Sequence, residues 1–143
     1  MQVFTQAEFD ALPVVDGVKQ CPTGDYSQIK TFSAFCRFSA LCRFGKFCSF
    51  GVSNYFGDRC SFGGRRAHPG YPLLALSGAG SVNRTVYAFN VEGGPWFEAG
   101  CFSGGLDAFR DKVRMDGDEL KCLQYLGFAN IVAATWCPER IEQ

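Results

Sequence analysis

The chain has 143 residues, of which 47% are hydrophobic and 20% are charged, and its 14 basic and 14 acidic residues leave no net charge. This composition is that of a globular protein with enough chain to bury a core, and it excludes an intrinsically disordered segment. The balanced charge gives no overall field that would draw the protein to nucleic acid or to an anionic membrane. We expect a single domain with three sections, residues 1–25, 26–67 and 68–143.

The sequence predicts a cytoplasmic protein without a membrane segment. No apolar run approaches the roughly 20 residues that cross a bilayer, and residues 1–8 lack the basic and apolar regions of a secretory signal. The eight cysteines are therefore interpreted as buried free thiols rather than as four disulfides. No metal or other cofactor is expected, because the cysteines lack the close pairs that are typical of zinc sites.

The N-terminal section begins with a capping box, Thr5 followed three residues later by Glu8. This pattern predicts a short helix over residues 6–12. Residues 14–25 are rich in Gly and Pro and predict turns with one short strand. We expect this section to cap the repeat that follows.

A six-residue repeat fills residues 26–67. A Phe recurs at every sixth position, a Cys follows four places after it, and Asn54 is the one interruption of the Cys series. The residues are Phe32, Phe38, Phe44, Phe50, Phe56 and Phe62, with Cys36, Cys42, Cys48 and Cys60. A period of six fits neither a helix nor a simple strand and predicts a strand–turn unit whose Phe and Cys side chains point inward. The Gly or Ser after each Phe is expected to take the unusual backbone angles of the turn.

Hexads such as FGKFCS at residues 44–49 and FGDRCS at residues 56–61 resemble the hexapeptide-repeat family. That family forms a left-handed parallel β-helix with three hexads in each coil. The resemblance implies that residues 18 apart stack, for example Phe32 on Phe50 and Cys42 on Cys60. This chain departs from the family in using Phe where aliphatic residues are usual, and a Phe-rich β-sheet core is the alternative.

The C-terminal section predicts strands over residues 73–76, 82–91 and 96–99 and helices over residues 106–114 and 118–136. The run AGCFSGGLDAFRDKV and the helix after it resemble the C-terminal module of small phage and prophage proteins. The expected fold class is therefore α+β: a short left-handed parallel β-helix stub capped by an N-terminal helix, followed by a β-hairpin and two C-terminal helices.

No complete catalytic apparatus is visible, and we expect a protein that is not an enzyme. The hexapeptide resemblance implies acyl transfer with a His as general base, but His68 is the single histidine and two coils leave little groove for coenzyme A. Cys101 precedes a predicted helix, yet no second histidine exists to activate it.

Charged residues are the candidate partner-binding groups, because oppositely charged surfaces suit electrostatic complementarity with another protein. The repeat carries basic residues on its exterior and the C-terminal helices carry acidic ones. They are Arg37, Arg43, Lys46, Arg59, Arg65 and Arg66, and Asp107, Asp111, Asp116, Asp118 and Glu119. Nucleic acid is a disfavoured partner, because inward Phe rings cannot serve as stacking platforms for bases.

The phage-like tail implies an accessory protein that inhibits a bacterial host defence complex, as anti-CRISPR proteins do, by contact with an unidentified host protein complex in the host cytoplasm. A homodimer is expected to cover the open ends of a short β-helix. Two alternatives remain at this point: a sponge for a small nucleotide signal, and a minimal hexapeptide acyltransferase that uses His68.

Overall fold

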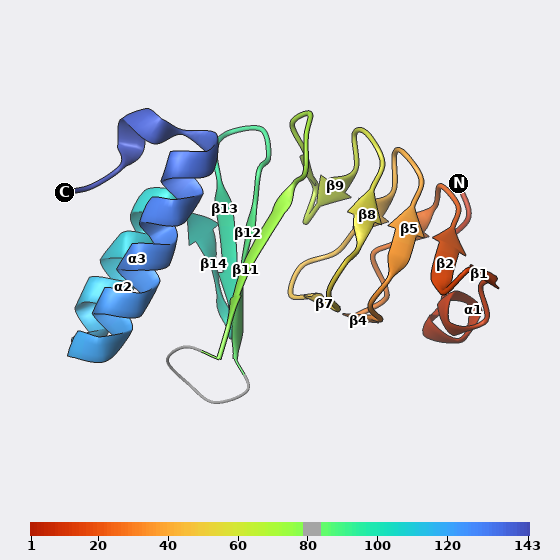
Figure 1. Cartoon of the computed structure of the whole chain (residues 1–143), viewed down its shortest axis with the longest axis horizontal. Coiled ribbons are helices and arrows are strands. Elements are labelled where there is room, and N and C mark those ends of the chain that lie inside the picture. Colours follow the sequence, from red (N-terminus) through yellow and green to blue (C-terminus); the bar gives the residue numbers. More distant parts are fainter. Residues whose placement is uncertain (79–83) are drawn as a thin grey trace. The chain divides into compact units, whose positions relative to one another are not determined.

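The computed structural model describes residues 1–78 and 84–143. The chain forms two compact units, Met1–Pro72 and Leu73–Gln143 (Figure 1). Residues 82 and 83, the start of one predicted strand, lie outside the described part. Of the helices that the structure describes, none has the length and apolar character needed to cross a bilayer.

Unit 1, all of whose residues are described, contains one helix and ten short strands. They are α1 (Gln6–Asp10), β1 (Val14–Val15), β2 (Val18–Cys21), β3 (Asp25–Tyr26), β4 (Thr31–Phe32), β5 (Cys36–Phe38), β6 (Arg43–Phe44), β7 (Ser49–Phe50), β8 (Tyr55–Phe56), β9 (Ser61–Phe62) and β10 (Arg65–Arg66). The capping box that starts α1 is confirmed: the Thr5 hydroxyl accepts from the backbone N–H of Glu8, whose carboxylate accepts from the N–H of Thr5.

Strands that lie 18 residues apart pair in parallel, which is the spacing that the resemblance to the hexapeptide-repeat family implies for stacked residues. The pairs are β4 with β7, β5 with β8, and β6 with β9, and they place Phe32 beside Phe50, Phe38 beside Phe56, and Phe44 beside Phe62. Figure 1 shows β2, β5 and β8 following one another along the unit.

The inward Phe rings form the core of unit 1. Each Phe in the first position of a hexad is buried, with at most 9% of its surface exposed. Rings 18 residues apart stack with centroids 5.0–5.4 Å apart, and successive rings meet edge to face. Burying one such side chain contributes about 1.5–3 kcal/mol, so this column of rings is the main source of stability in the unit.

The predicted left-handed β-helix stub with an N-terminal cap is nevertheless wrong. Within the described residues the chain is an α+β protein with 14 strands in four sheets. Two of the sheets that contain repeat strands are mixed, because β1 pairs antiparallel with β2 and β10 pairs antiparallel with β9.

The N-terminal section joins these sheets instead of capping them. Strand β2 pairs in parallel with β5, and β3 pairs in parallel with β6. Strand pairing satisfies the backbone hydrogen-bonding groups of this section, which a cap of turns would leave to solvent. From α1, the buried Phe9 ring packs 5.1 Å from the Phe32 ring, edge to face.

In the first five hexads, residues 32–61, the turn lies at the fourth residue and not at the Gly or Ser after the Phe, whereas in residues 62–67 the Gly after the Phe, Gly63, has a φ of 58°. Residues in this fourth position have φ between 58° and 66°, the left-handed region: Phe35, Leu41, Phe47, Ser53 and Arg59. At Gly51, in the second position, the absence of a side chain lets the backbones of two adjacent coils approach closely. A Cβ on Gly51 would lie 2.4 Å from the backbone nitrogen of Ala34 in the preceding coil. Left-handed backbone costs a non-glycine residue roughly 1–2 kcal/mol, so other interactions must offset this cost at each turn.

The cysteines supply part of that compensation. Each repeat thiol lies 3.1–3.4 Å from the carbonyl oxygen three residues earlier, to which it donates across the turn. Asn54 occupies the same position, and its side-chain amide donates to the Gly51 carbonyl at 3.2 Å. All eight cysteines are free, and the prediction that they are buried is confirmed for Cys21 and the repeat cysteines, which act as donors as well as small apolar groups. It is wrong for Cys101, which is exposed, and Cys122 and Cys137 are half-buried.

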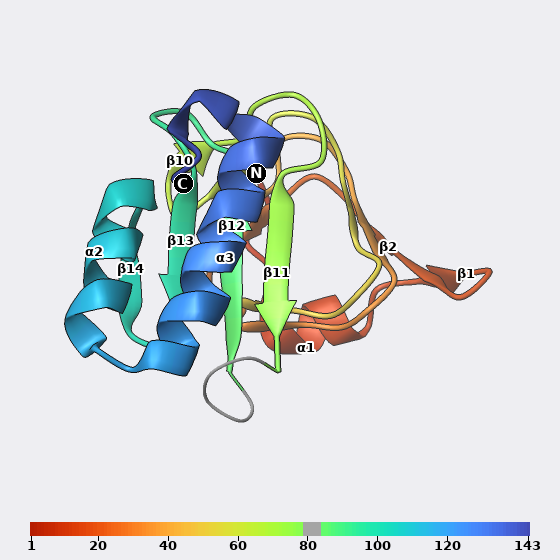
Figure 2. The same ribbon diagram turned by 60° about the vertical axis from the view of Figure 1, so that its left-hand side comes forward.

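Unit 2 is an antiparallel sheet covered by two helices. Its elements are β11 (Leu73–Ser77), β12 (Thr85–Phe89), β13 (Trp96–Ala99), β14 (Phe102–Gly105), α2 (Leu106–Asp116), α3 (Glu119–Trp136) and the 3-10 turn Pro138–Arg140, with sheet order β11-β12-β13-β14. Both helices lie on one face of the sheet (Figure 2). The Phe97 ring of β13 stacks on the Phe109 ring of α2 with centroids 4.4 Å apart.

The predicted helices of unit 2 are confirmed, whereas the strand β14 was missed. Its sequence, FSGG, reads as a turn because two of its four residues are glycine. It forms because Phe97 and Trp96 offer it a partner edge, where they pair with Gly104 and Gly105. Local propensity is overridden here by the available backbone partners.

Candidate functional site

Three outward side chains form a row across the sheet β1-β2-β5-β8. The register places Gln20 of β2 beside Arg37 of β5, and Arg37 beside Tyr55 of β8. Arg37 and Tyr55 are the last residues of their hexads, 18 residues apart, so the repeat that stacks the Phe rings inside also stacks these two side chains outside.

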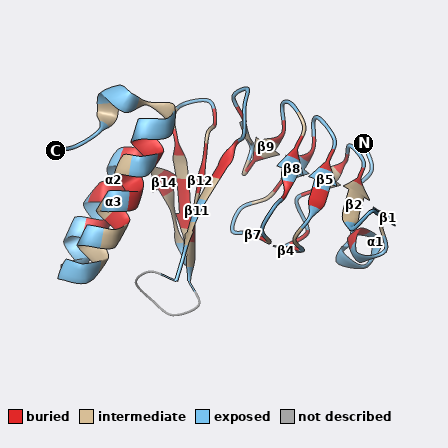
Figure 3. Ribbon diagram, in the orientation of Figure 1, coloured by how far each residue is buried: buried red, intermediate tan, exposed pale blue. Residues whose placement is uncertain are grey.

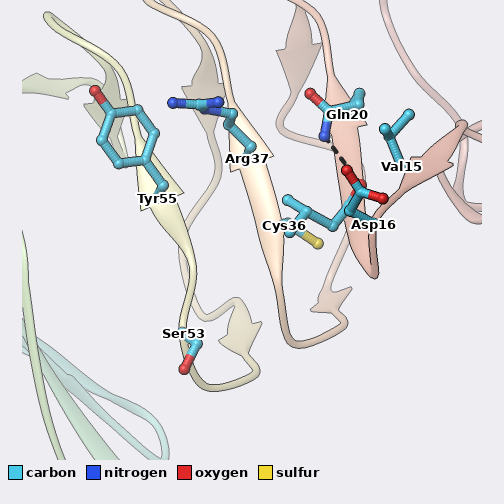
Figure 4. A pocket seen from close by; sticks show the side chains of 8 residues that line it. Val15, Asp16, Gln20, Cys36, Arg37, Ser53 and Tyr55 are labelled. Atoms are coloured by element: carbon cyan, nitrogen blue, oxygen red, sulfur yellow. Dashed lines mark hydrogen bonds between the residues drawn. The ribbon is translucent and has the colours of Figure 1, made fainter.

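The Arg37 guanidinium lies over the Tyr55 ring, 5.2 Å from its centroid (Figure 4). Among the described residues Arg37 has no ion-pair partner. A cation over an exposed ring gains about 0.5–1 kcal/mol, which favours one orientation of Arg37 and leaves its N–H donors available to a ligand.

A hairpin forms the opposite wall of the site. Asp16 and Gly17 connect β1 to β2 with φ of 52° and 78°, the backbone that a two-residue hairpin of the Asp-Gly type requires. Val15 pairs with Val18 at its end. Figure 2 shows β1 projecting away from the rest of unit 1.

Between this hairpin and the Arg37–Tyr55 pair lies a pocket of about 560 Å³. Its lining residues are Val15, Asp16, Val18, Gln20, Cys36, Arg37, Ser53 and Tyr55. Most of the lining is apolar, with a few polar groups placed around it, which is the composition of binding sites in general.

Large apolar side chains on the segments that line the pocket are exposed to solvent. Val52 is 70% exposed, Val14 60%, Val15 55%, Tyr55 55% and Phe35 52%. The Phe35 backbone N–H donates to the Val52 carbonyl at 3.0 Å, so these two side chains are neighbours on adjacent coils. We call these five residues together with Arg37 the Tyr55 surface.

Buried thiols of unit 1 form two hydrogen-bonded pairs, Cys21 with Cys36 and Cys42 with Cys60. A hydrogen bond between the side chains of Cys21 and Cys36, together with burial, raises the pKa of the Cys21 thiol above its ordinary value. The corresponding bond from Cys60, again with burial, raises the pKa of Cys42. One thiol of each pair is therefore held in its protonated form, and the two thiols of the pair are hydrogen-bonded to each other in the protein interior.

The predicted basic residues do not form one patch. Arg37 lies in the pocket, whereas Arg43, Arg65 and Arg66 belong to the sheet β10-β9-β6-β3. Arg59 is exposed at a left-handed turn, and Lys46 is exposed between β6 and β7.

Most of the predicted acidic residues have structural partners. Asp107 forms an ion pair with Arg140 at 2.8 Å, and Asp116 forms one with Lys112 at 3.1 Å. Asp118 is the N-cap of α3 and accepts from the Lys121 N–H at 2.9 Å. Glu119 and Asp111 are exposed on the helices, and Glu119 lines a second, smaller pocket beside α3.

His68 and Cys101, the two residues considered for catalysis, are both exposed and line neither of these pockets. The charge-based reasoning on the sequence found Arg37 but missed the hairpin and Tyr55. The signal for Tyr55 was present in the 18-residue period, which places it beside Arg37, and the signal for the hairpin was the Asp16-Gly17 pair between valines.

Comparisons with protein-family models, with curated proteins and with solved structures found no match to this chain.

Proposed function

We propose that the chain is a non-enzymatic binding protein that contacts a protein partner through the Tyr55 surface. The observation that carries the proposal is the guanidinium of Arg37 held over an exposed tyrosine ring, beside a pocket and among exposed apolar side chains. Tyr and Arg beside a pocket are the residues that most often dominate binding energy at protein interfaces.

An exposed aromatic side chain near the pocket supports this proposal. Phe35 lies at a turn next to Cys36, which lines the pocket, and about half of its side chain faces solvent. Exposed aromatic residues of this kind are enriched at protein interfaces.

The resemblance of residues 97–136 to phage and prophage proteins supports the identity of the partner. We assign the partner to a bacterial host defence complex, which the protein inhibits in the host cytoplasm as anti-CRISPR proteins do. This assignment depends on the resemblance, and the use of the Tyr55 surface depends on the geometry, so the two are tested separately.

The test of the surface uses two arginines that occupy the same position of successive hexads. Arg37→Ala removes the cation from the Tyr55 surface, whereas Arg43→Ala removes one from a different sheet. We expect Arg37→Ala and Val52→Lys to weaken capture of the host partner about 30-fold or more, and Arg43→Ala to leave it unchanged. Equal loss in Arg37→Ala and Arg43→Ala would contradict a role for this surface.

The test of the partner is protection of phage in bacteria that carry a defence system. Cells that express the chain are expected to lose resistance to phage, and cells that express Val52→Lys are expected to keep it. A wild-type chain that protects phage from none of the host's defence systems would contradict the assignment.

A second candidate function is a sponge for a small nucleotide signal. The pocket volume of about 560 Å³ falls in the range of small-molecule sites, and an arginine over a tyrosine ring suits a planar, negatively charged ligand. Mass spectrometry of the denatured purified protein tests this candidate. A nucleotide that co-purifies with the wild type and is absent from Arg37→Ala would support it, and a ligand-free wild type would oppose it.

A further inference from the structure

Helix α3 has an exposed face without charge. From Cys122 to Trp136 it contains no Asp, Glu, Lys or Arg. One side of the helix packs in the core of unit 2 through Tyr125, Phe128, Ala129, Val132 and Ala133. An ordinary surface helix carries charged residues on the opposite side, so the apolar exposed side of α3 requires a separate explanation.

The exposed residues form a narrow stripe. Leu123 is 72% exposed, Leu120 63% and Ile131 58%, and Gly127 and Ala134 are exposed between and beyond them. At 3.6 residues per turn these five positions lie within about 40° of one line along the helix. Figure 3 shows exposed residues along the outer side of α3.

The stripe is symmetric about Gly127. Leu123 and Ile131 lie four residues before and after it, and Leu120 and Ala134 lie seven residues before and after it. Two copies of such a helix that cross in antiparallel orientation at Gly127 place Leu123 against Ile131 of the other copy. The same crossing places Leu120 against Ala134, a large side chain against a small one.

Gly127 allows the close approach that this crossing needs. A Cβ built at Gly127 meets no atom within 4 Å, so the space above the glycine is open to a neighbouring helix. Beside it lies a pocket of about 330 Å³ lined by Leu123, Leu126 and Gly127 on the helix and by Glu142 on the C-terminal tail. A partner side chain can enter this pocket, and Arg114 and Glu119 form a polar rim of the kind that surrounds interface cores.

We propose that a second copy of this chain covers α3, with the two α3 helices antiparallel and related by a two-fold axis at Gly127. A symmetric interface must be self-complementary, and the arrangement of the stripe about Gly127 meets that condition. The absence of charge along the seam removes the repulsion that like charges would cause at such an axis. This interface uses unit 2 alone and is independent of the Tyr55 surface.

The interface is small, so the dimer is expected to dissociate on dilution. One helix against another buries an area at the low end of specific interfaces, on the order of 1,000 Å² in total. We therefore expect a dissociation constant on the order of 10 µM.

Sedimentation velocity of the full chain across concentrations that bracket this value is the test. The wild type is expected to change from monomer to dimer as its concentration rises. Leu123→Lys and Ile131→Glu are each expected to raise the dissociation constant about 30-fold or more, because each buries an unpaired charge at two symmetric places. Val52→Lys, an equally exposed position in unit 1, is the matched control and is expected to dimerise like the wild type.

A mixture of the two α3 variants tests the orientation. In a mixed dimer the new ammonium at position 123 of one copy faces the new carboxylate at position 131 of the other, and the second contact is the wild-type Leu123–Ile131 pair. Mixing Leu123→Lys with Ile131→Glu is therefore expected to restore dimers that neither variant forms alone. A wild type that stays monomeric at every concentration, a Leu123→Lys variant that still dimerises, or a mixture that stays monomeric would each overturn the proposal.

Discussion

Asn54 interrupts the cysteine series of the repeat, and its replacement tests how the turns of unit 1 are stabilised. Its side chain is 95% buried, since 5% of its surface is exposed. The side-chain carbonyl oxygen accepts from the Cys36 backbone N–H at 2.8 Å, and the side-chain amide donates to the Gly51 carbonyl at 3.2 Å. Asn54 therefore stabilises its own turn and links its coil to Cys36 in the preceding coil, 18 residues earlier.

The Asn54→Ala variant leaves both of these backbone groups without their partner. A buried group left unsatisfied costs about 1–3 kcal/mol, so two such groups give an expected loss of about 2–6 kcal/mol in the free energy of unfolding of unit 1. The Asn54→Cys variant is the matched control, because it restores the residue found at this position in the other hexads. A thiol there can donate to the Gly51 carbonyl but accepts poorly from Cys36 N–H, so its expected loss is about 1–2 kcal/mol.

Urea unfolding followed by two signals measures the effect. Both tryptophans, Trp96 and Trp136, lie in unit 2, so tryptophan fluorescence reports that unit, whereas far-ultraviolet circular dichroism reports both units. We expect the circular dichroism midpoint to fall in the order wild type, Asn54→Cys, Asn54→Ala, at unchanged slope. An Asn54→Ala variant as stable as Asn54→Cys would refute the role given to the Gly51 contact, and an Asn54→Cys variant as stable as the wild type would refute the role given to the Cys36 contact.

Three further changes test other parts of the structure. Gly51→Ala is expected to destabilise unit 1 by about 1–3 kcal/mol, measured by urea unfolding, because the added Cβ would lie 2.4 Å from a backbone nitrogen of the preceding coil. Hydrogen bonds from the side chain and backbone of Ser27 lower the pKa of Asp25, so its stabilisation is present above the unfolded pKa of about 3.9 and is lost as the pH falls through the lower folded pKa. Asp25→Asn is therefore expected to flatten the acid limb of a stability–pH curve, and an unchanged limb would count against this assignment. Glu142→Gln weakens the ion pair at 3.1 Å with the buried Arg110 and is expected to cost unit 2 about 1–3 kcal/mol, seen as a lower fluorescence midpoint. An unchanged midpoint would show that the ion pair between Glu142 and Arg110 does not stabilise unit 2.

The period of six determined much of unit 1. Because Phe recurs at every sixth residue, the burial of the rings followed from the sequence alone, whereas the stacking of Phe32 on Phe50 was implied by the resemblance to the hexapeptide-repeat family. The capping box of α1 and the two helices of unit 2 were also predictable, since each depends on residues close together in the chain. These features are local or periodic, and such patterns are visible without coordinates.

The tertiary structure alone decided how the flanking segments complete the sheets. The antiparallel partners β1 and β10 depend on which backbone edges remain open after the coils form, and no local pattern records that. Strand β14 exists because β13 offers it an edge, although its own residues favour a turn.

For the candidate site, too, the sequence predicted some features and the tertiary structure decided the others. The sequence marked Arg37 as exposed and basic, and its period already placed Tyr55 beside it. The pocket required the hairpin at Asp16 to project next to that pair, which is a relation between segments about 20 and 40 residues apart. Charge and periodicity identify side chains that can bind, whereas their convergence on one surface depends on strand pairing across the whole unit.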